Sequence, residues 1–307
     1  MSRLELLTRT YSPAWRGLAI AVVGGDEREQ EIANLAAGSG ATVRAFGFPW
    51  PQDGIQGVVH AGSAREALSG ARIALFPIPG IATDGSLFGT EKIVPTEDLL
   101  AMMAPGAHII LGRADSGLAR AAAAKSVSLH EYEHDQELML LRAPAIAEAA
   151  VKIIIENTSI TIHGADICVV GLGNIGTVLL RTLMALGAHV TVAARNPVQR
   201  AAAHAMGAKV LPLDQLGNAA SNFDVILSTV PAPVVTAAII DRLPARALIM
   251  DLAAPPGSCN LDYARKTGRK AIWARALGRR APVTVGASQW SGIARIIDTI
   301  LDGASSR

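Results

Sequence analysis

Short apolar runs alternate with helix-length segments along almost the whole chain. In the first half, the apolar runs predict strands near Leu18–Gly24, Ala41–Gly47, Ile73–Ile78, His108–Gly112 and Val127–Glu131. The segments between them predict helices near Glu27–Ala37, Thr96–Met103 and Gly117–Lys125. Strands that are apolar at nearly every position are buried on both faces, so this alternation is typical of a mostly parallel sheet with helices on either side.

The second half repeats the alternation. Strands are predicted at Asp166–Val170, His189–Ala194, Phe223–Thr229, Ala247–Leu252 and Lys270–Trp273, and helices at Ile175–Leu186, Pro197–Ala205 and Asp262–Thr267. The long segment Glu133–Asn157 predicts one connecting helix, in which Pro144 is either a kink or a first-turn residue. The last segment, Ala287–Leu301, is amphipathic, and its apolar face carries Ile293, Ile296, Ile297 and Ile300.

The repeated pattern predicts an α/β protein with two doubly wound domains and mostly parallel sheets. A chain of 307 residues is long enough for about two domains, at roughly 100–200 residues each. We assign residues 1–145, with a returning C-terminal helix at 287–303, to an N-terminal substrate domain. Residues 146–290 form the second domain.

Composition narrows the classes of protein. Half of the residues are hydrophobic, which excludes a disordered chain, and a net charge of +2 gives no reason to expect nucleic acid or a membrane as partner. The two cysteines, Cys168 and Cys259, suit a reducing compartment and are too few for a disulfide framework or a metal cluster. No apolar stretch reaches the ~18 residues of a membrane span, and no signal-peptide core precedes the first strand. We expect a soluble, cytoplasmic protein without a metal site.

The strongest chemical signal is the glycine turn at residues 171–176 (GLGNIG), which lies between a predicted strand and a predicted helix. The first glycine permits a tight turn, the second lets the backbone approach a diphosphate, and the third allows the helix to pack closely on the strand. The helix N-terminus then offers N–H groups and partial positive charge to the phosphates. The turn predicts a Rossmann domain that binds NAD(P), through Gly171, Gly173, Asn174, Ile175 and Gly176.

The end of the next strand distinguishes the two nicotinamide nucleotides. An NAD site usually has an acidic residue there, which accepts hydrogen bonds from the ribose. This chain has Arg195 and Asn196. An arginine pairs with the 2′-phosphate of NADP, so NADP(H) is favoured, while NAD use and a merely solvated arginine stay open. The turn with Thr229, Val230 and Pro231 is expected to border the ribose and nicotinamide.

A second pair of glycines, Gly24 and Gly25, also follows a strand but lacks the spacing of a nucleotide turn. Asp26 would repel a phosphate there. We interpret Asp26 as the cap of the following helix.

With these residues in view, the chain resembles the family of the dipicolinate synthase A-subunit. The resemblance runs from about Gly17 to Gly303. Its more distinctive motifs are GGDxRxxE, with Asp26, Arg28 and Glu31, and the TIHG segment at residues 161–164. Further matching segments are Leu75–Pro77, Asp84-Gly85, Ser228–Pro231, Asp251–Ala253, Pro256-Gly257, and Ala281-Pro282 with Thr284 and Gly286. The chain departs from the family pattern at the basic stretch Arg275–Arg280 and at Val283.

The resemblance implies formation of pyridine-2,6-dicarboxylate by NAD(P)-linked oxidation of a dihydrodipicolinate-type intermediate, during spore formation. It also implies a partner, the flavoprotein-like B-subunit of dipicolinate synthase; a homo-oligomer stays open. A dicarboxylate needs cationic partners, and Arg113 and Arg28, the latter held by Glu31, are candidates. Eight Lys or Arg residues and no acid lie between Tyr263 and Ile297, a patch that suits the steering of an anion.

The catalytic base is left open by the sequence. The candidates that we consider for the catalytic site are Asp84, Arg113 and Glu148, with His108, His130 and His134 as further bases and His163 as a hinge residue. Two other functions also stay open. One is another two-domain NAD(P) dehydrogenase of a small carboxylate, and the other is a module that senses NADP(H) without turnover.

Overall fold

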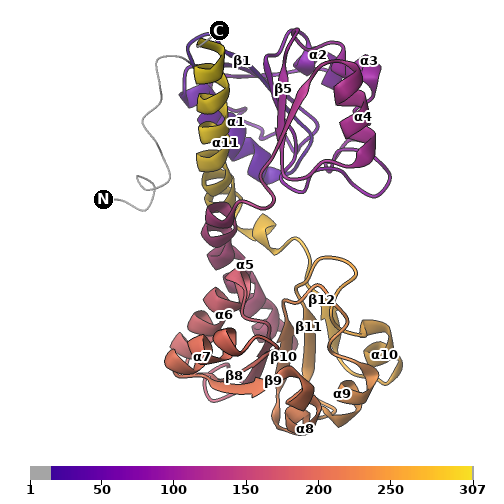
Figure 1. Ribbon diagram of the computed structural model, residues 1–307, viewed down its shortest axis with the longest axis vertical. Coiled ribbons are helices and arrows are strands. Elements are labelled where there is room, and N and C mark those ends of the chain that lie inside the picture. Colours follow the sequence, from indigo (N-terminus) through magenta and orange to yellow (C-terminus); the bar gives the residue numbers. More distant parts are fainter. Residues whose placement is uncertain (1–14, 306–307) are drawn as a thin grey trace. The chain divides into compact units, whose positions relative to one another are not determined.

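The computed structural model describes residues 15–305, which form two compact α/β units (Figure 1). The first unit comprises residues up to Arg142 together with the segment from Ala281 onward, and the second comprises Ala143–Arg280. Each unit has its own six-stranded sheet, and every pair of neighbouring named strands is parallel. The predicted fold class is therefore confirmed.

The first sheet has the strand order β3-β2-β1-β4-β5-β6. Its strands are β1 (Ala19–Val23), β2 (Thr42–Phe46), β3 (Val58–His60), β4 (Ile73–Leu75), β5 (His108–Leu111) and β6 (Ser128–Glu131). The helices of this unit include α1 (Glu27–Gly38), α2 (Ala64–Leu68), α3 (Glu97–Leu100) and α4 (Ser116–Ala124). This order is that of the doubly wound dinucleotide-binding fold, with a switch point between β1 and β4.

The second sheet has the strand order β9-β8-β7-β10-β11-β12, which corresponds strand by strand to the order of the first sheet. Its strands are β7 (Asp166–Val170), β8 (His189–Ala194), β9 (Lys209–Pro212), β10 (Val225–Ser228), β11 (Leu248–Asp251) and β12 (Ala271–Trp273). Its helices include α6 (Asn174–Ala185), α7 (Pro197–Ala205), α8 (Leu216–Ala219), α9 (Ala237–Arg242) and α10 (Leu261–Lys266). The switch point of this sheet lies between β7 and β10.

Both faces of the second sheet are buried, as its apolar strands predict. Ile167 and Val169 pack into one hydrophobic cluster, and Cys168 and Val170 pack into another on the opposite face. The Cys168 side chain is fully buried, and burial raises the pKa of its thiol. It is a core residue, the simpler of the possible roles for a cysteine in an apolar strand.

Two long helices differ from their predicted bounds. Helix α5 (Gln136–Asn157) carries Pro144 well inside it, so the interpretation of Pro144 as a first-turn residue is wrong. Helix α11 (Pro282–Ser305) starts before the predicted Ala287, because proline is favoured in a first helical turn. Helix α11 lies along α1 (Figure 1), and Gly286 permits the close approach, since a Cβ there would lie 2.7 Å from the Arg28 carbonyl oxygen.

Two imidazoles of the first sheet form a pair. The His108 Nδ1 and His130 Nε2 atoms lie 3.0 Å apart on neighbouring strands. Burial, the His130 ring and Arg72 lower the pKa of His108, and burial lowers the pKa of His130. Each group therefore binds fewer protons in the native state than in the unfolded chain, where its pKa is about 6.5.

We expect this pair to make the first unit sensitive to acid. Its contribution to the free energy of unfolding is complete above pH ~6.5 and is lost as the pH falls through the lowered pKa values. The loss should be below about 1 kcal/mol, because both rings are partly exposed and screened by solvent. Urea unfolding at a series of pH values should show a weaker acid dependence for His108→Phe/His130→Phe than for the wild type. The exposed His134→Gln serves as control, and an unchanged pH profile in the double variant contradicts the expectation.

Candidate functional site

The glycine turn joins β7 to α6 at the switch point of the second sheet. Gly171 has a φ of +89°, and a Cβ there would lie 2.6 Å from the Val230 Cγ2 atom. A Cβ on Gly176 would lie 2.3 Å from the Gly171 carbonyl oxygen. Both positions therefore require glycine, the first for the turn and the second for close packing of helix on strand.

Gly173 is different, because nothing in the protein would touch its Cβ within 4 Å. It is also the N-cap of α6, and no side chain caps this helix end. The first backbone N–H groups of α6 therefore lie at the positive end of the helix dipole without a side-chain cap, beside the open space at Gly173. The turn thus has the geometry that an anion such as a diphosphate needs.

The end of β8 presents two arginines. Arg195 follows the strand directly and is exposed, without a carboxylate partner among the described residues. Arg200 lies on the first turns of α7, and its Nη1 atom donates to the carbonyl oxygens of Ala194 and Arg195, each at 2.8 Å. The sequence reading missed Arg200, although an arginine five residues after Arg195 on a predicted helix was a usable signal.

The other residue predicted at this strand end has a structural partner. The Asn196 side chain accepts a hydrogen bond from the Val198 backbone N–H at 2.8 Å and so caps α7. Its role in shaping the helix start is clear, while a contact with a cofactor stays a prediction.

The turn after β10 is tied to the glycine turn. The Thr229 hydroxyl donates to the Val170 carbonyl oxygen at 3.2 Å, which holds residues 229–231 against the end of β7. The Asp251 carboxylate, at the end of β11, is buried and accepts hydrogen bonds from the backbone N–H groups of Ala253, Ser258 and Cys259 at 2.6–2.9 Å. These contacts fix two loops at the carboxyl edge of the sheet, where α/β folds bind ligands.

The equivalent turn of the first unit is closed by its own side chains. Asp26 caps α1, as the sequence predicts, within a full capping box. The Glu29 carboxylate accepts hydrogen bonds from the backbone N–H groups of Asp26 at 2.7 Å and Ile78 at 2.9 Å. A buried carboxylate thus occupies the place at the switch point where a phosphate would need these amides.

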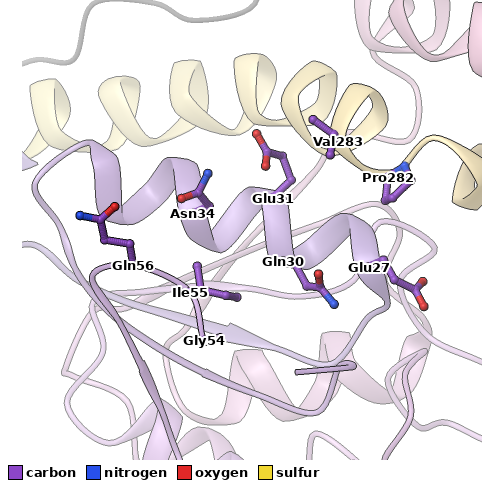
Figure 2. A pocket seen from close by; sticks show the side chains of 9 residues that line it. All are labelled: Glu27, Gln30, Glu31, Asn34, Gly54, Ile55, Gln56, Pro282 and Val283. Carbon is purple, nitrogen blue, oxygen red and sulfur yellow. The ribbon is translucent and has the colours of Figure 1, made fainter. Parts of the chain in front are cut away.

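Arg28 does not have the partner that was expected. Its guanidinium bonds both carboxylate oxygens of Asp26, at 2.8 and 2.7 Å, and the pair is buried. The expectation that Glu31 holds Arg28 is therefore wrong. The reason is that Glu31 faces α11 and a surface pocket (Figure 2). Asp26, by contrast, lies within hydrogen-bonding distance of the Arg28 guanidinium.

The catalytic candidates lie on both units. Asp84 is an exposed carboxylate in the first unit whose pKa is lowered to about 2 by hydrogen bonds from Ser86 and by Lys92 at 3.2 Å. A carboxylate held so firmly in its charged form is a weak base near neutral pH. Arg113 is exposed just beyond β5, at the carboxyl edge of the first sheet, and Glu148 is exposed on α5 in the second unit.

The histidines are divided between a pair and single exposed side chains. His108 and His130 bond each other, while His134 and His163 are exposed. A Cβ on Gly187 would lie 2.4 Å from the His163 ring, which therefore packs over the turn before β8.

A pocket of about 250 Å³ lies in the first unit between α1, the loop at residues 54–56 and the start of α11 (Figure 2). Its side chains include the carboxylates of Glu27 and Glu31 and the amides of Gln30, Asn34 and Gln56, but no Lys or Arg. Burial raises the pKa of Glu31. A lining of this kind disfavours an anion, so we do not place a dicarboxylate there.

Comparisons with known proteins agree on both units. Residues 19–133 match the family described as the N-terminal domain of the dipicolinate synthase A-subunit, and residues 151–260 match Shikimate / quinate 5-dehydrogenase. The chain is 30% identical over 275 residues to the dipicolinate synthase A-subunit of Bacillus subtilis (strain 168), across 88% of this chain and 92% of that protein.

Comparison with solved structures also finds the dipicolinate synthase A-subunit. The dipicolinate synthase A-subunit from Bacillus halodurans superposes with a TM-score of 0.83 at 28% identity, over 94% of this chain and 98% of its own. The counterpart from Bacillus subtilis gives the same TM-score and identity, over 95% of this chain and 100% of its own. A transhydrogenase from Sinorhizobium meliloti shares the fold alone, with a TM-score of 0.67 at 15% identity over 96% of this chain and 93% of its own.

Residues 15–305, the part of the chain that the structure describes, contain neither a candidate membrane span nor a candidate metal site. None of the helices there is long and apolar enough to cross a bilayer. No group of three potential metal ligands occurs in the same part of the chain.

Proposed function

The chain belongs to the family of the dipicolinate synthase A-subunit, and from this premise we propose that it is an NADP(H)-dependent oxidoreductase. Its proposed reaction is the oxidation of a dihydrodipicolinate-type intermediate to pyridine-2,6-dicarboxylate. The observation that carries the proposal is the glycine turn between β7 and α6, where no side chain caps the helix and a Cβ on Gly173 would meet nothing within 4 Å, which leaves room for a diphosphate at the helix N-terminus.

The cofactor residues proposed are those of the glycine turn, of the β8 end and of the β10 turn. Gly173, Asn174 and Ile175 would hold the diphosphate at the start of α6, and the exposed Arg195 would pair with the 2′-phosphate. Arg200 positions Arg195, because it holds the carbonyl groups at the end of β8. Thr229, Val230 and Pro231 border the ribose and nicotinamide.

The reaction needs little beyond positioning. An oxidised nicotinamide held by these residues would supply the hydride acceptor for oxidation of the substrate ring, and aromatisation of the ring favours the forward direction. The protein orients the two carboxylates through arginine and leaves the ring carbon near the cofactor. Arg113, in the first unit, stays a candidate for a carboxylate contact. Glu148 is preferred over Asp84 as the base, because Ser86 and Lys92 hold Asp84 in its charged form.

The direct test is the appearance of reduced nicotinamide absorbance when the protein meets freshly generated dihydrodipicolinate and NADP. The flavoprotein-like B-subunit is the proposed partner, so the assay is run with and without it. Turnover in either mixture supports the proposal. Binding of NADP without turnover in both mixtures indicates a cofactor-sensing module instead.

Replacing Arg195 by aspartate should reverse the preference for the cofactor. A charge-assisted hydrogen bond to the 2′-phosphate is lost and a repulsive carboxylate takes its place, so the NADP affinity should fall roughly 10- to 100-fold. The NAD affinity should change less. Calorimetric titration with both nucleotides measures the effect, with Arg181→Asp on the exposed side of α6 as control. Equal losses for NADP and NAD remove the assignment of Arg195.

A further inference from the structure

A tryptophan and an arginine form a cation–π pair at the carboxyl end of β12. Trp273 is the last residue of this strand, and the Arg275 guanidinium carbon lies 5.2 Å from the centroid of the Trp273 ring. Strand β12 runs parallel to β11, with Trp273 opposite Asp251. The pair therefore lies at the same edge of the sheet as the loops that follow β10 and β11.

The Trp273 ring is fixed in place by the loop after β11. Its Nε1 atom donates to the Ala253 carbonyl oxygen at 3.0 Å, and Gly257 leaves room for the edge of the ring, since a Cβ there would lie 3.5 Å from Cζ2. The same loop is held by three backbone hydrogen bonds to Asp251. Trp273 is thus a rigid platform for the Arg275 side chain.

The Arg275 side chain has N–H donors without a partner among the described residues. It is exposed, and no carboxylate of the described residues lies within ion-pairing distance of it. A cation–π contact uses the charge of a guanidinium and none of its N–H donors, which form the fork that matches a carboxylate. An exposed arginine held by an aromatic ring and without an acidic partner is well suited to bind an anion.

The position of Trp273 and Arg275 in the second sheet indicates which ligand Arg275 would contact. In a doubly wound fold, the two halves of the sheet each hold one nucleotide of the dinucleotide, on either side of the switch point. The 2′-phosphate residues lie in the β7–β8–β9 half, so the nicotinamide belongs to the β10–β11–β12 half. Arg275 lies at the outer strand of that half, about 14 Å from β7 at three strand spacings.

We infer that Arg275, in its cation–π contact with Trp273, binds one carboxylate of the substrate beside the nicotinamide. This inference rests on the proposed function and adds a substrate contact on the cofactor unit itself. The site takes a planar carboxylate, which the guanidinium meets with two parallel N–H groups. Trp273 acts as a positioning residue, because it orients the guanidinium without touching the ligand.

The inference is tested with pyridine-2,6-dicarboxylate as probe, by equilibrium dialysis against the full chain in the presence of NADP. Arg275→Gln should weaken probe binding roughly 10- to 100-fold, the usual effect of losing a charge-assisted hydrogen bond. Arg275→Lys should restore only part of it, because an ammonium lacks the fork. The matched control is Arg280→Gln, an exposed arginine of the same segment that loses the same charge.

The outcomes separate a specific site from a general positive field. A loss in Arg275→Gln, with near wild-type probe binding in Arg280→Gln and unchanged NADP affinity in both, supports the site. Equal losses in both variants overturn it, because charge alone then explains the binding. Undiminished probe binding in Arg275→Gln overturns it as well, and turnover by that variant would leave the proposed function standing. Wild-type protein that binds NADP, fails to bind the probe and shows no turnover overturns both.

Discussion

Gly173→Val should abolish nicotinamide nucleotide binding while the protein keeps its fold. The backbone at Gly173 has a φ of −84°, which any L-residue adopts, and no protein atom would meet the new Cβ. The side chain instead fills the space in front of the α6 N-terminus, where the diphosphate must come within hydrogen-bonding distance of the amides. We expect the affinity for NADP to fall by at least about 100-fold.

Stability measured on the same variant makes the result specific. A valine in place of the N-cap glycine should cost about 1 kcal/mol of unfolding free energy. Gly38→Val is the matched control, because Gly38 is also an exposed glycine with open space around its Cβ and lies on α1 in the other unit. Calorimetric titration gives the affinity and urea unfolding gives the stability. NADP binding at wild-type strength by Gly173→Val contradicts the assignment of this helix end.

Glu29→Ala should destabilise the first unit more than any other change considered above. The substitution removes the acceptor of the Asp26 and Ile78 backbone N–H groups, and each unsatisfied buried group costs about 1–3 kcal/mol. The expected loss is therefore about 2–6 kcal/mol of unfolding free energy. Urea unfolding monitored by tryptophan fluorescence measures it. Glu91→Ala, an exposed glutamate of the same unit, should stay within about 0.5 kcal/mol of wild type.

The pH dependence gives this prediction a second readout. Burial, opposed by Arg28 and reinforced by Asp26, raises the pKa of Glu29 to about 7. The native state then binds more protons than the unfolded chain, where the pKa is about 4.3. The stability linked to this proton is complete below pH ~4.3 and is lost as the pH rises through 7. The stability difference between wild type and Glu29→Gln should therefore shrink between pH 5 and pH 8, and a constant difference would show that Glu29 does not titrate there.

The sequence predicts the buried strands and the edge strands β6 and β12, but it misses the edge strands β3 and β9. Strand β1 is a continuous apolar run, and β7 and β11 are apolar except for one aspartate at a strand end, because helices cover both faces of the sheets. Strand β3 has two exposed residues out of three, and β9 ends in Pro212, so neither shows the pattern of a buried strand. Both become strands because a neighbour in the sheet supplies their hydrogen bonds, which is a tertiary effect.

The contacts of individual side chains were harder to predict from the sequence than the helices and strands. The glycine turn can be predicted from the sequence because Gly171 and Gly176 meet local requirements of the backbone, while Gly173 leaves space in front of the helix. Glu29 looks like an ordinary helix residue in the sequence, and its buried role depends on Ile78, which is 49 positions away in the chain. In the sequence, Arg275 is only one member of a basic stretch. Its contact with Trp273 depends on the end of β12, where the ring is held in place, and the sequence does not show this.

The return of α11 to the first unit bears on how the protein is made. The chain leaves this unit at Ala143 and comes back at Ala281, so the second unit is a single uninterrupted segment. During translation, the second unit can be completed while the first still lacks the helix that covers α1 and bonds Trp15 through Asp298. The first unit therefore begins to be synthesised first but can complete its fold only last. Until α11 has been made, the apolar surface that α11 covers stays exposed and can be bound by chaperones.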